Sequence, residues 1–596
     1  MAVTIRLRTE VLKRWSGDSY SLYLNQTMFF DTPASLLRPI HSLLKSPFEF
    51  AAGVSISSKL RKHLFMRNDF EDLLALGCLF DEAKDALKPF MSSLRIKLQD
   101  EFSLHIAVED DLNQVCQREF LGVSPQSISM DSARYVTHIS VQCQLERLYD
   151  HFQLKRSGQM KPLSAIECVN AIRFLMLSEA LALALAGIAS VKRCHEKFEL
   201  RACNPVAREA LRRTWFARMA DQSSHAATII LANQLAQAGA KHVRDVQLLT
   251  ERLLDQDLSL PWSQVPSEGR ALQSVQQIYA AVEVVALLMV LGQRGESVMM
   301  RGPELIQRGL DFSKLSALVR RQDNALITDQ FLMRQGNSLS LRIGSASKGL
   351  RTLFRQLEID FCERDALSKY VGGIFFEQVT IKQRIVQGRD FQDRYDVIEG
   401  FSRDKIVGGY KNKCDVEFII RDIQQNHYYF IQAKHALLGE TAFLQAIIEA
   451  VQGDIGYGLG QLCEAKRLLD EGLLYDTLRA RGISDASPKN STFVLLHNIA
   501  QFDYQESMAG ISLYDWASFR NLLKDAECQY GGLDGQLTWI RLQKPLIATN
   551  PMSVIERLLT EHPAYKRNFP DPWAQERSTM SYEVCGKLIC VRGLGI

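Results

Sequence analysis

Four polar residues lie on two neighbouring segments that are otherwise rich in β-branched and aromatic residues. The segments are 413–420 and 428–434, and the polar stretch 422–427 between them is typical of a turn. The four polar residues are Asp415, Glu417, Gln432 and Lys434. Symmetric pairing about the turn puts Asp415 opposite Lys434, and it puts Glu417 opposite Gln432. Because side chains alternate between the faces of a strand, the four are expected to project from one face.

The opposite face of this hairpin is expected to be apolar. The residues predicted to form that core face are Val416, Phe418, Ile431 and Ala433. A polar group on a buried strand is costly unless it is paired or has a function. The four polar residues are therefore the best candidates for chemistry in this chain.

The residue types suit metal-assisted hydrolysis of a phosphodiester. Mg²⁺ binds oxygen ligands and takes one or two carboxylates together with waters and substrate phosphate oxygens. Asp415 supplies a carboxylate and Gln432 an amide oxygen. Lys434, on the same face, can hold or deprotonate an attacking water and balance the charge on the phosphate.

At these residues the sequence resembles the PD-(D/E)xK, or restriction-endonuclease-like, nuclease superfamily. The signature of that superfamily is an acidic residue on one strand and an acidic-x-Lys triplet on the next, within an αβββαβ core. Asp415, in Cys-Asp-Val-Glu-Phe, matches the first part, and Gln432-Ala-Lys434 matches the second. Glutamine at the first triplet position is similar to the QxK variant of Mrr-type restriction nucleases. It removes one negative charge from the implied metal site, which should weaken the affinity for the cation unless Glu417 or another acid compensates.

The resemblance implies further site residues on the flanking helices. The superfamily often adds a glutamate from the helix before the sheet, and Glu377 is the best match, with Glu363 and Glu399 as weaker ones. In the helix after the triplet a glutamine or basic residue often faces the site. Gln461 looks like that position, and Lys466 is a second candidate.

The predicted site can be stated residue by residue. The predicted catalytic residues are Asp415, Gln432, Lys434 and Glu377; the predicted metal ligands are Asp415, Gln432 and Glu417; and the predicted substrate-binding residues are Gln461, Lys466 and His435. His435 directly follows Lys434 and so points to the opposite face, where it is structural or contacts a phosphate at the strand end.

A simpler interpretation of the four residues is a surface hairpin with an Asp415–Lys434 ion pair. The near-continuous apolar runs Ile419-Ile420 and Phe430-Ile431 argue against it, because such runs are typical of strands covered on both faces. A charged residue at the end of a covered strand favours a functional site.

The order of elements predicts an α+β multidomain protein. We expect a mostly helical region over 1–131 and an all-α domain over 132–335, where apolar residues recur with helical spacing. Small polar residues over 336–349 predict a linker. Residues 350–596 are expected to form a restriction-endonuclease-like α/β domain, a central mixed sheet flanked by helices.

Composition sets broad limits on the class of protein. The 596 residues exceed one ordinary core, and 46% hydrophobic and 23% charged residues are typical of a soluble globular protein. The net charge of +3 means that a DNA-binding surface must be local. The 12 cysteines form no CxxC pair, and the charged start predicts no signal peptide, so a cytoplasmic location is expected. Apolar runs are too short or carry a glutamate, so no membrane partner is expected.

The sequence therefore predicts a DNA endonuclease dependent on Mg²⁺ or Mn²⁺. Its helical region would bind a protein partner, form a homo-oligomer or sense a trigger, as in bacterial restriction or anti-phage defence effectors, by fold-level analogy. Two alternatives remain open. One is a non-catalytic adaptor in which the nuclease fold binds DNA or assembles a complex, and the other is a DNA-repair nuclease with the same chemistry.

Overall fold

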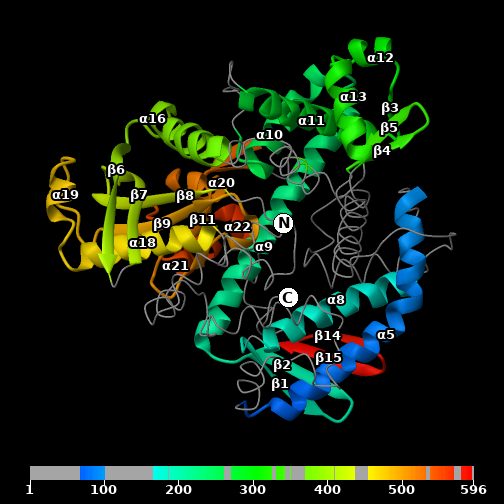
Figure 1. Ribbon diagram of the computed structural model, residues 1–596, viewed down its shortest axis with the longest axis horizontal. Helices are drawn as coiled ribbons and strands as arrows, with labels where there is room; N and C mark the ends of the chain where they lie inside the picture. The colour runs from blue at the N-terminus through cyan, green and yellow to red at the C-terminus, as the bar shows by residue number, and fades with distance from the viewer. Residues whose placement is uncertain are drawn as a thin grey trace.

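The computed structural model describes the residues 67–100, 165–185, 187–260, 270–324, 331–341, 350, 353, 369–407, 410–435, 454–531, 537–568 and 579–592. Figure 1 shows a six-stranded sheet, a separate four-stranded sheet and a group of helices between and beside them. The pattern of residues 3–8 predicts a strand and that of residues 440–452 predicts a helix, but both ranges lie outside the described residues.

The six-stranded sheet carries the candidate site. Its strand order is β10-β11-β9-β8-β7-β6. The bounds are β6 (Tyr395–Val407), β7 (Tyr410–Asp422), β8 (His427–Lys434), β9 (Ser491–His497), β10 (Gln505–Glu506) and β11 (Ser512–Asp515). Strands β6, β7 and β8 pair antiparallel in sequence order, whereas β9 pairs parallel to β8 and β11 parallel to β9. A parallel neighbour requires a crossover, and the helix α18 (Asp454–Asp470) lies in it.

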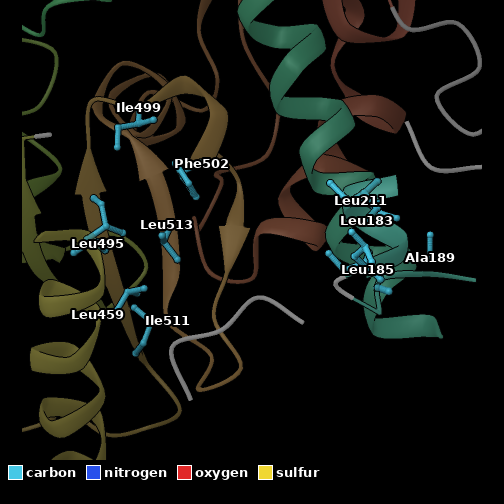
Figure 2. Close-up of a cluster of buried hydrophobic side chains, with 14 of the residues drawn as sticks. Leu183, Leu185, Ala189, Leu211, Leu459, Leu495, Ile499, Phe502, Ile511 and Leu513 are labelled. Atoms are coloured by element: carbon cyan, nitrogen blue, oxygen red, sulfur yellow. The ribbon is translucent and has the colours of Figure 1, made fainter. Parts of the chain in front are cut away.

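Helices cover both faces of this sheet. On one face α18 packs against β7, β8 and β9, and Figure 2 shows its Leu459 near Leu495 and Ile511 of the sheet. On the other face the buried cluster includes residues of η6 (Lys369–Gln383, a π-helix), α16 (Arg384–Gln387), α20 (Trp516–Leu523) and α21 (Pro551–Glu561). The prediction of strands covered on both faces is confirmed. Ile419 and Phe430 belong to the buried cluster on the α18 face, and Ile420 and Ile431 belong to the buried cluster on the opposite face.

The prediction that 132–335 is all-α is wrong. The helix α8 (Ala165–Leu185) is followed at Gly187 by a φ of 75°, the left-handed conformation that often follows the end of a helix. The chain then forms the antiparallel strands β1 (Ala189–Cys194) and β2 (Lys197–Ala202). Apolar residues run through the end of α8 into β1 without a gap, and spacing alone therefore hid the change from helix to strand.

Strand β2 pairs in parallel with a strand from the far end of the chain. That strand is β15 (Lys587–Arg592), which forms a hairpin with β14 (Thr579–Val584) and completes the sheet order β1-β2-β15-β14. The helices α5 (Phe70–Asp100) and α8 pack together and against this sheet. Packing therefore crosses the predicted boundaries at 131 and 350.

A second group of helices surrounds α11 (Arg270–Gly292), which is mostly buried between Ile278 and Leu291. Its other members are η3 (Val243–Val246), α10 (Gln247–Asp257), α12 (Gly302–Gln307) and α13 (Phe312–Asp323), with the small sheet β3 (Val298–Met299), β5 (Ser338–Leu341) and β4 (Leu332–Gln335). The predicted linker begins inside the β4–β5 hairpin, whose turn holds Gly336 at a φ of 56°. Small polar residues are as typical of a hairpin turn as of a linker, so this part of the prediction is wrong.

The helix α9 (Pro205–Gln237) joins all three buried clusters. Asn204 caps its start by accepting a hydrogen bond from the Ala207 backbone N–H at 2.8 Å. Along its 33 residues, Leu211 lies beside Leu183 and Leu185 of α8 (Figure 2), Phe216 belongs to the cluster on the other face of the six-stranded sheet, and Ala232 belongs to the cluster around α11. Figure 1 shows α9 running between these parts.

The remaining elements complete the described part of the chain. They are α19 (Tyr475–Arg479), η7 (Ala500–Phe502), β12 (Cys528–Gly531), β13 (Leu537–Ile540) and α22 (Pro563–Asn568). Among the residues described, no helix has both the length and the apolar character needed to cross a bilayer.

Candidate active site

The candidate site lies where β7 and β8 meet α18. The β7–β8 ladder runs from Asp422 opposite His427 to Phe418 opposite Ile431, which is the predicted register. The ladder ends one residue before Glu417 and Gln432. The side chains of the predicted site therefore lie just beyond the last regular backbone pair of β7 and β8. There the two strands are joined through side chains.

The faces of the strand pair reverse at Gly400 of β6 and Glu417 of β7. Phe418, Ile431 and Ala433 lie in the predicted core, but Val416 packs in the opposite cluster, beneath α18. Gly400 and Glu417 drop out of a ladder that is regular on either side of them. A Cβ on Gly400 would lie 1.9 Å from the Val416 carbonyl oxygen, so only glycine permits this close approach. The predicted position of Val416 is therefore wrong.

Gln432 is the centre of the polar contacts. Its side chain is fully buried, and Nε2 donates to Gln461 Oε1 at 2.6 Å. With the carboxamide turned over, its N–H instead donates to Glu417 Oε1 at 2.9 Å and its oxygen accepts from Lys434 Nζ at 3.1 Å. Both orientations place Glu417, Lys434 and Gln461 around one amide group.

Gln461 extends these contacts to Asp415, since its Nε2 donates to Asp415 Oδ2 at 3.0 Å. The resulting series is Glu417, Gln432, Gln461 and Asp415, that is, two carboxamides between two carboxylates. Each carboxamide has one donor end and one acceptor end along the series. With both carboxylates ionised, one contact in the series must join two acceptor oxygens. A proton or a cation is needed to relieve it.

Glu377 of η6 adds a third carboxyl group to this region. Burial, together with repulsion by Glu417 and Asp415 and against attraction by Lys434, raises its pKa to about 8. The structure thus brings the predicted helix glutamate near the strand residues. Of the weaker alternatives, Glu399 is exposed and pairs with Lys382 at 2.7 Å, and Glu363 lies outside the described residues.

The raised pKa of Glu377 predicts a pH-dependent stability. The folded protein holds this proton up to about pH 8, whereas the unfolded chain releases it near the ordinary value of 4.5. The contribution of the protonated Glu377 carboxyl group to the free energy of unfolding is full below pH 4.5 and is lost as the pH rises through 8. Without divalent cations, Glu377→Gln is therefore expected to raise Tm relative to wild type by about 2 °C or more at pH 9, and less at pH 6.

The control for this effect is Glu399→Gln, which changes an exposed carboxylate. Its Tm difference from wild type is expected to be the same at both pH values. Differential scanning fluorimetry of the three proteins in EDTA measures the effect. A Tm difference for Glu377→Gln that does not change with pH would contradict the assignment.

Gly458 is a site residue that the sequence did not reveal. A Cβ at this position of α18 would lie 2.8 Å from Leu495 Cδ1 and 3.0 and 3.1 Å from Lys434 Cγ and Cε. The missing side chain lets Lys434 run along the helix toward Gln432. The glycines at 456, 458 and 460 lie inside a helix, and this placement is the signal for close packing.

We expect Gly458→Ala to displace Lys434 and to lower any activity of the site by about 10-fold or more, with a loss of about 1–3 kcal/mol of stability from overpacking. The matched control is Gly292→Ala, at a helical glycine with nothing within 4 Å of the added Cβ. Cleavage rates and Tm of the two variants test this prediction. Equal rates in both variants would show that Gly458 does not position Lys434.

Two predicted substrate-binding residues are placed elsewhere. Lys466 pairs with Asp470 at 2.9 Å, and its Cε lies near Gly510 at the far edge of the sheet. His435 is partly buried, its Nε2 lies 3.3 Å from the Leu258 carbonyl oxygen, and its ring packs against Phe376. These contacts support the interpretation of His435 as a structural residue. Gln461, in contrast, lies at the centre of the site.

The donor set suits a hard divalent cation. Asp415 and Glu417 offer carboxylate oxygens and Gln432 an amide oxygen, which are the ligand types that Mg²⁺ and Mn²⁺ prefer. The excess of acceptor oxygens in the Glu417–Asp415 series is what a cation would relieve. Within the described ranges, however, no three His, Cys, Asp or Glu side chains are already arranged as a metal-binding group.

No protein-family model, curated protein or solved structure matches this chain.

Proposed function

We propose that this protein is a divalent-metal-dependent DNA endonuclease of the PD-(D/E)xK type, with its site at the middle of β7 and the end of β8. The observation that carries the proposal is the convergence of Glu417, Lys434 and Gln461 around the buried amide of Gln432, with Asp415 bonded in turn to Gln461. These side chains come from two strands and a helix. A surface ion pair would not require a buried carboxamide at its centre.

The order of elements supports the proposal. A helix (η6–α16) precedes three antiparallel strands, β6, β7 and β8, and α18 then leads to β9, parallel to β8. This is the αβββαβ order of the superfamily that the motif resembles. The acidic residue, the triplet, the earlier glutamate and the later glutamine each occupy the element that the resemblance implies.

The proposed roles follow from the contacts. Asp415, Glu417 and Gln432 would hold the cation, whose chemistry would be polarisation of the scissile phosphate and a lowered pKa of a bound water. Lys434 would orient the attacking water and offset the charge that develops on the phosphate. Gln461 orients Asp415 and Gln432, because it bonds to both. Glu377, protonated in the metal-free protein, would act as a further carboxyl group near the water.

The rest of the chain is proposed to gate or target the nuclease. The helix α9 links the cluster around α11 to one face of the six-stranded sheet and to α8, beside the four-stranded sheet. A partner, a second copy or a trigger that moves α9 would therefore act on the sheet directly. A role in restriction or anti-phage defence is the proposed setting, and DNA repair shares the same chemistry.

One observation favours the adaptor alternative. Gln461 donates to Asp415 and Gln432 donates to Gln461, so the site is closed by its own hydrogen bonds. A cation can enter only if these contacts rearrange. In an adaptor the same contacts would simply be permanent.

Plasmid cleavage tests the proposal. Wild type is expected to nick or linearise plasmid DNA with Mg²⁺ or Mn²⁺ and to lose this activity in EDTA. Asp415→Asn is expected to abolish it, whereas the control Asp470→Asn, at an exposed carboxylate of α18, is expected to cut like wild type. Cleavage that persists in Asp415→Asn would refute the site. A wild type that binds DNA but does not cut it, with or without Mn²⁺, would favour the adaptor.

A further inference from the structure

One face of the four-stranded sheet β1-β2-β15-β14 is packed. Residues such as Val191, Leu200 and Ile589 point into the buried cluster that also contains residues of α5 and α8 (Figure 1). Because side chains alternate between the faces of a strand, the residues next to them in each strand point the other way. The charged residues on this second face, which we call the outer sheet face, are Lys192, Lys197, Glu199, Arg201, Glu583 and Arg592.

Two arginines of the outer sheet face lie directly opposite each other. Arg201 of β2 is in register with Arg592 of β15. Neighbouring strands are about 4.8 Å apart, so the two side chains start from adjacent backbone positions. Like charges placed directly opposite on neighbouring strands are destabilising. Both side chains are nonetheless exposed, Arg592 by 56%. The arginine pair therefore carries an electrostatic cost that a bound anion would remove.

Glu199 is the acidic residue beside this pair, and it is shared among several cations. Its carboxylate lies 2.7 Å from Lys197 and 3.8 Å from Arg592, and Lys192 is directly opposite it on β1. The hydrogen bond and charge of Lys197, followed by the charges of Arg592 and Lys192, hold the pKa of Glu199 below its ordinary value. Arg201 forms no ion pair with any residue that the structure describes. One carboxylate thus stands among four basic side chains.

The outer sheet face concentrates positive charge in a chain that is nearly neutral. Its four basic and two acidic residues give it a net charge of +2, whereas all 596 residues together have a net charge of +3. The second acid, Glu583, is opposite Leu588, toward the other end of β15 from the arginine pair. A DNA-binding surface on a chain of this charge must be local, and this face has the charge of such a surface.

We infer that the outer sheet face binds the phosphate backbone of DNA, with Arg201 and Arg592 contacting phosphate oxygens. A guanidinium group binds phosphate through two parallel N–H···O bonds, and a lysine adds a point charge. Such contacts position nucleic acid without reading its sequence. The inference rests on the proposed function, since it names the surface by which the same protein holds its substrate. An acidic protein segment is the other partner of suitable charge, and the experiment separates the two.

DNA binding in EDTA tests the inference without cleavage. A fluorescein-labelled DNA duplex is titrated with full-length wild type and with Arg201→Gln/Arg592→Gln, at salt concentrations between about 50 and 200 mM. The double variant is expected to bind about 10-fold or more weakly. The slope of log affinity against log salt is expected to fall in magnitude by about 2, one for each lost phosphate contact. Its Tm is expected to equal or exceed that of wild type, because a like-charge pair is removed.

The control is the double variant Arg244→Gln/Arg320→Gln. It removes the same charge from exposed positions of η3 and α13. Its affinity is expected to stay within about 2-fold of wild type, with the same salt slope, because general attraction alone does not depend on a particular contact. Unlabelled duplex and a poly-glutamate chain of equal charge are then compared as competitors for wild type. The duplex is expected to displace the labelled DNA at a lower concentration.

Four results would overturn the inference. They are no duplex binding by wild type, unchanged affinity and salt slope in Arg201→Gln/Arg592→Gln, an equal loss in the control variant, and equal displacement by poly-glutamate, which would indicate an acidic protein partner. A wild type that binds the duplex through Arg201 and Arg592 but never cuts plasmid would refute the proposed catalysis and leave the inference intact. Plasmid cleavage by wild type, with unchanged binding in Arg201→Gln/Arg592→Gln, would do the opposite.

Discussion

Replacing Lys434 by methionine is expected to lower the rate of DNA cleavage by about 10²–10³-fold. The ammonium group lies 3.1 Å from the Gln432 amide and is the cation nearest the three carboxyl groups of the site. Losing a positioned charge that stabilises the reacting phosphate has an effect of this size. Methionine keeps the unbranched chain that packs against Gly458, so the fold is expected to survive. Single-turnover cleavage at saturating Mn²⁺ measures the change.

Lys466→Met is the matched control for this variant. The same charge is removed from the same helix–sheet layer, but Lys466 pairs with Asp470 on the helix surface, away from Gln432. Its cleavage rate is expected to stay within about 2-fold of wild type, because exposed ion pairs of this kind contribute little. Equal losses in both variants would mean that the lysines act through general attraction for DNA, which the structure does not predict.

Replacing Arg394 by methionine is expected to destabilise the sheet domain by about 3–5 kcal/mol, since it leaves a buried carboxylate without its partner. Arg394, at the start of β6, donates to Asp422 at 3.0 Å and to both oxygens of Asp525 at 2.9 Å. The Asp422 side chain is fully buried. Asp525 in turn accepts from the Leu546 backbone N–H at 2.7 Å. One guanidinium thus joins β6, β7 and the segment that follows α20.

Arg467→Met provides the comparison for Arg394→Met. Arg467 also contacts two carboxylates, Glu464 at 2.7 Å and Glu471 at 2.5 Å, but its side chain is 39% exposed. Its loss is expected to change stability by less than about 1 kcal/mol. Urea denaturation followed by tryptophan fluorescence compares the two variants. Similar midpoints for both would show that burial does not set the strength of the Arg394 contacts.

The local features of the candidate site were predictable from the sequence. Alternating residue types and the polar turn 422–427 correctly predicted the β7–β8 hairpin and its register. The apolar runs correctly predicted strands covered on both faces. These features depend on neighbours in the chain, because strand alternation and turn chemistry act over a few residues.

Predictions from the sequence were wrong where contacts between distant segments determine the structure. Val416 changes face because Gly400, on the neighbouring strand, approaches its backbone closely. Gln461 and Lys466 are both candidates in the sequence for the residue of the helix that faces the site, and only the packing of α18 shows that Gln461 reaches Gln432. The pairing of β2 with β15 joins residues almost four hundred positions apart, which no local pattern specifies.

The sequence by itself thus determined which chemical groups are available and on which strands and helices they lie. The tertiary structure decided which of them meet: Gln461 with Asp415, Lys434 with Gln432, and Glu377 with the strand carboxylates. The physical reason is that residue type and spacing fix local conformation, whereas proximity between segments follows from close packing of the whole core. Gly458 illustrates this best, since its importance comes from the lysine that occupies the space a side chain would fill.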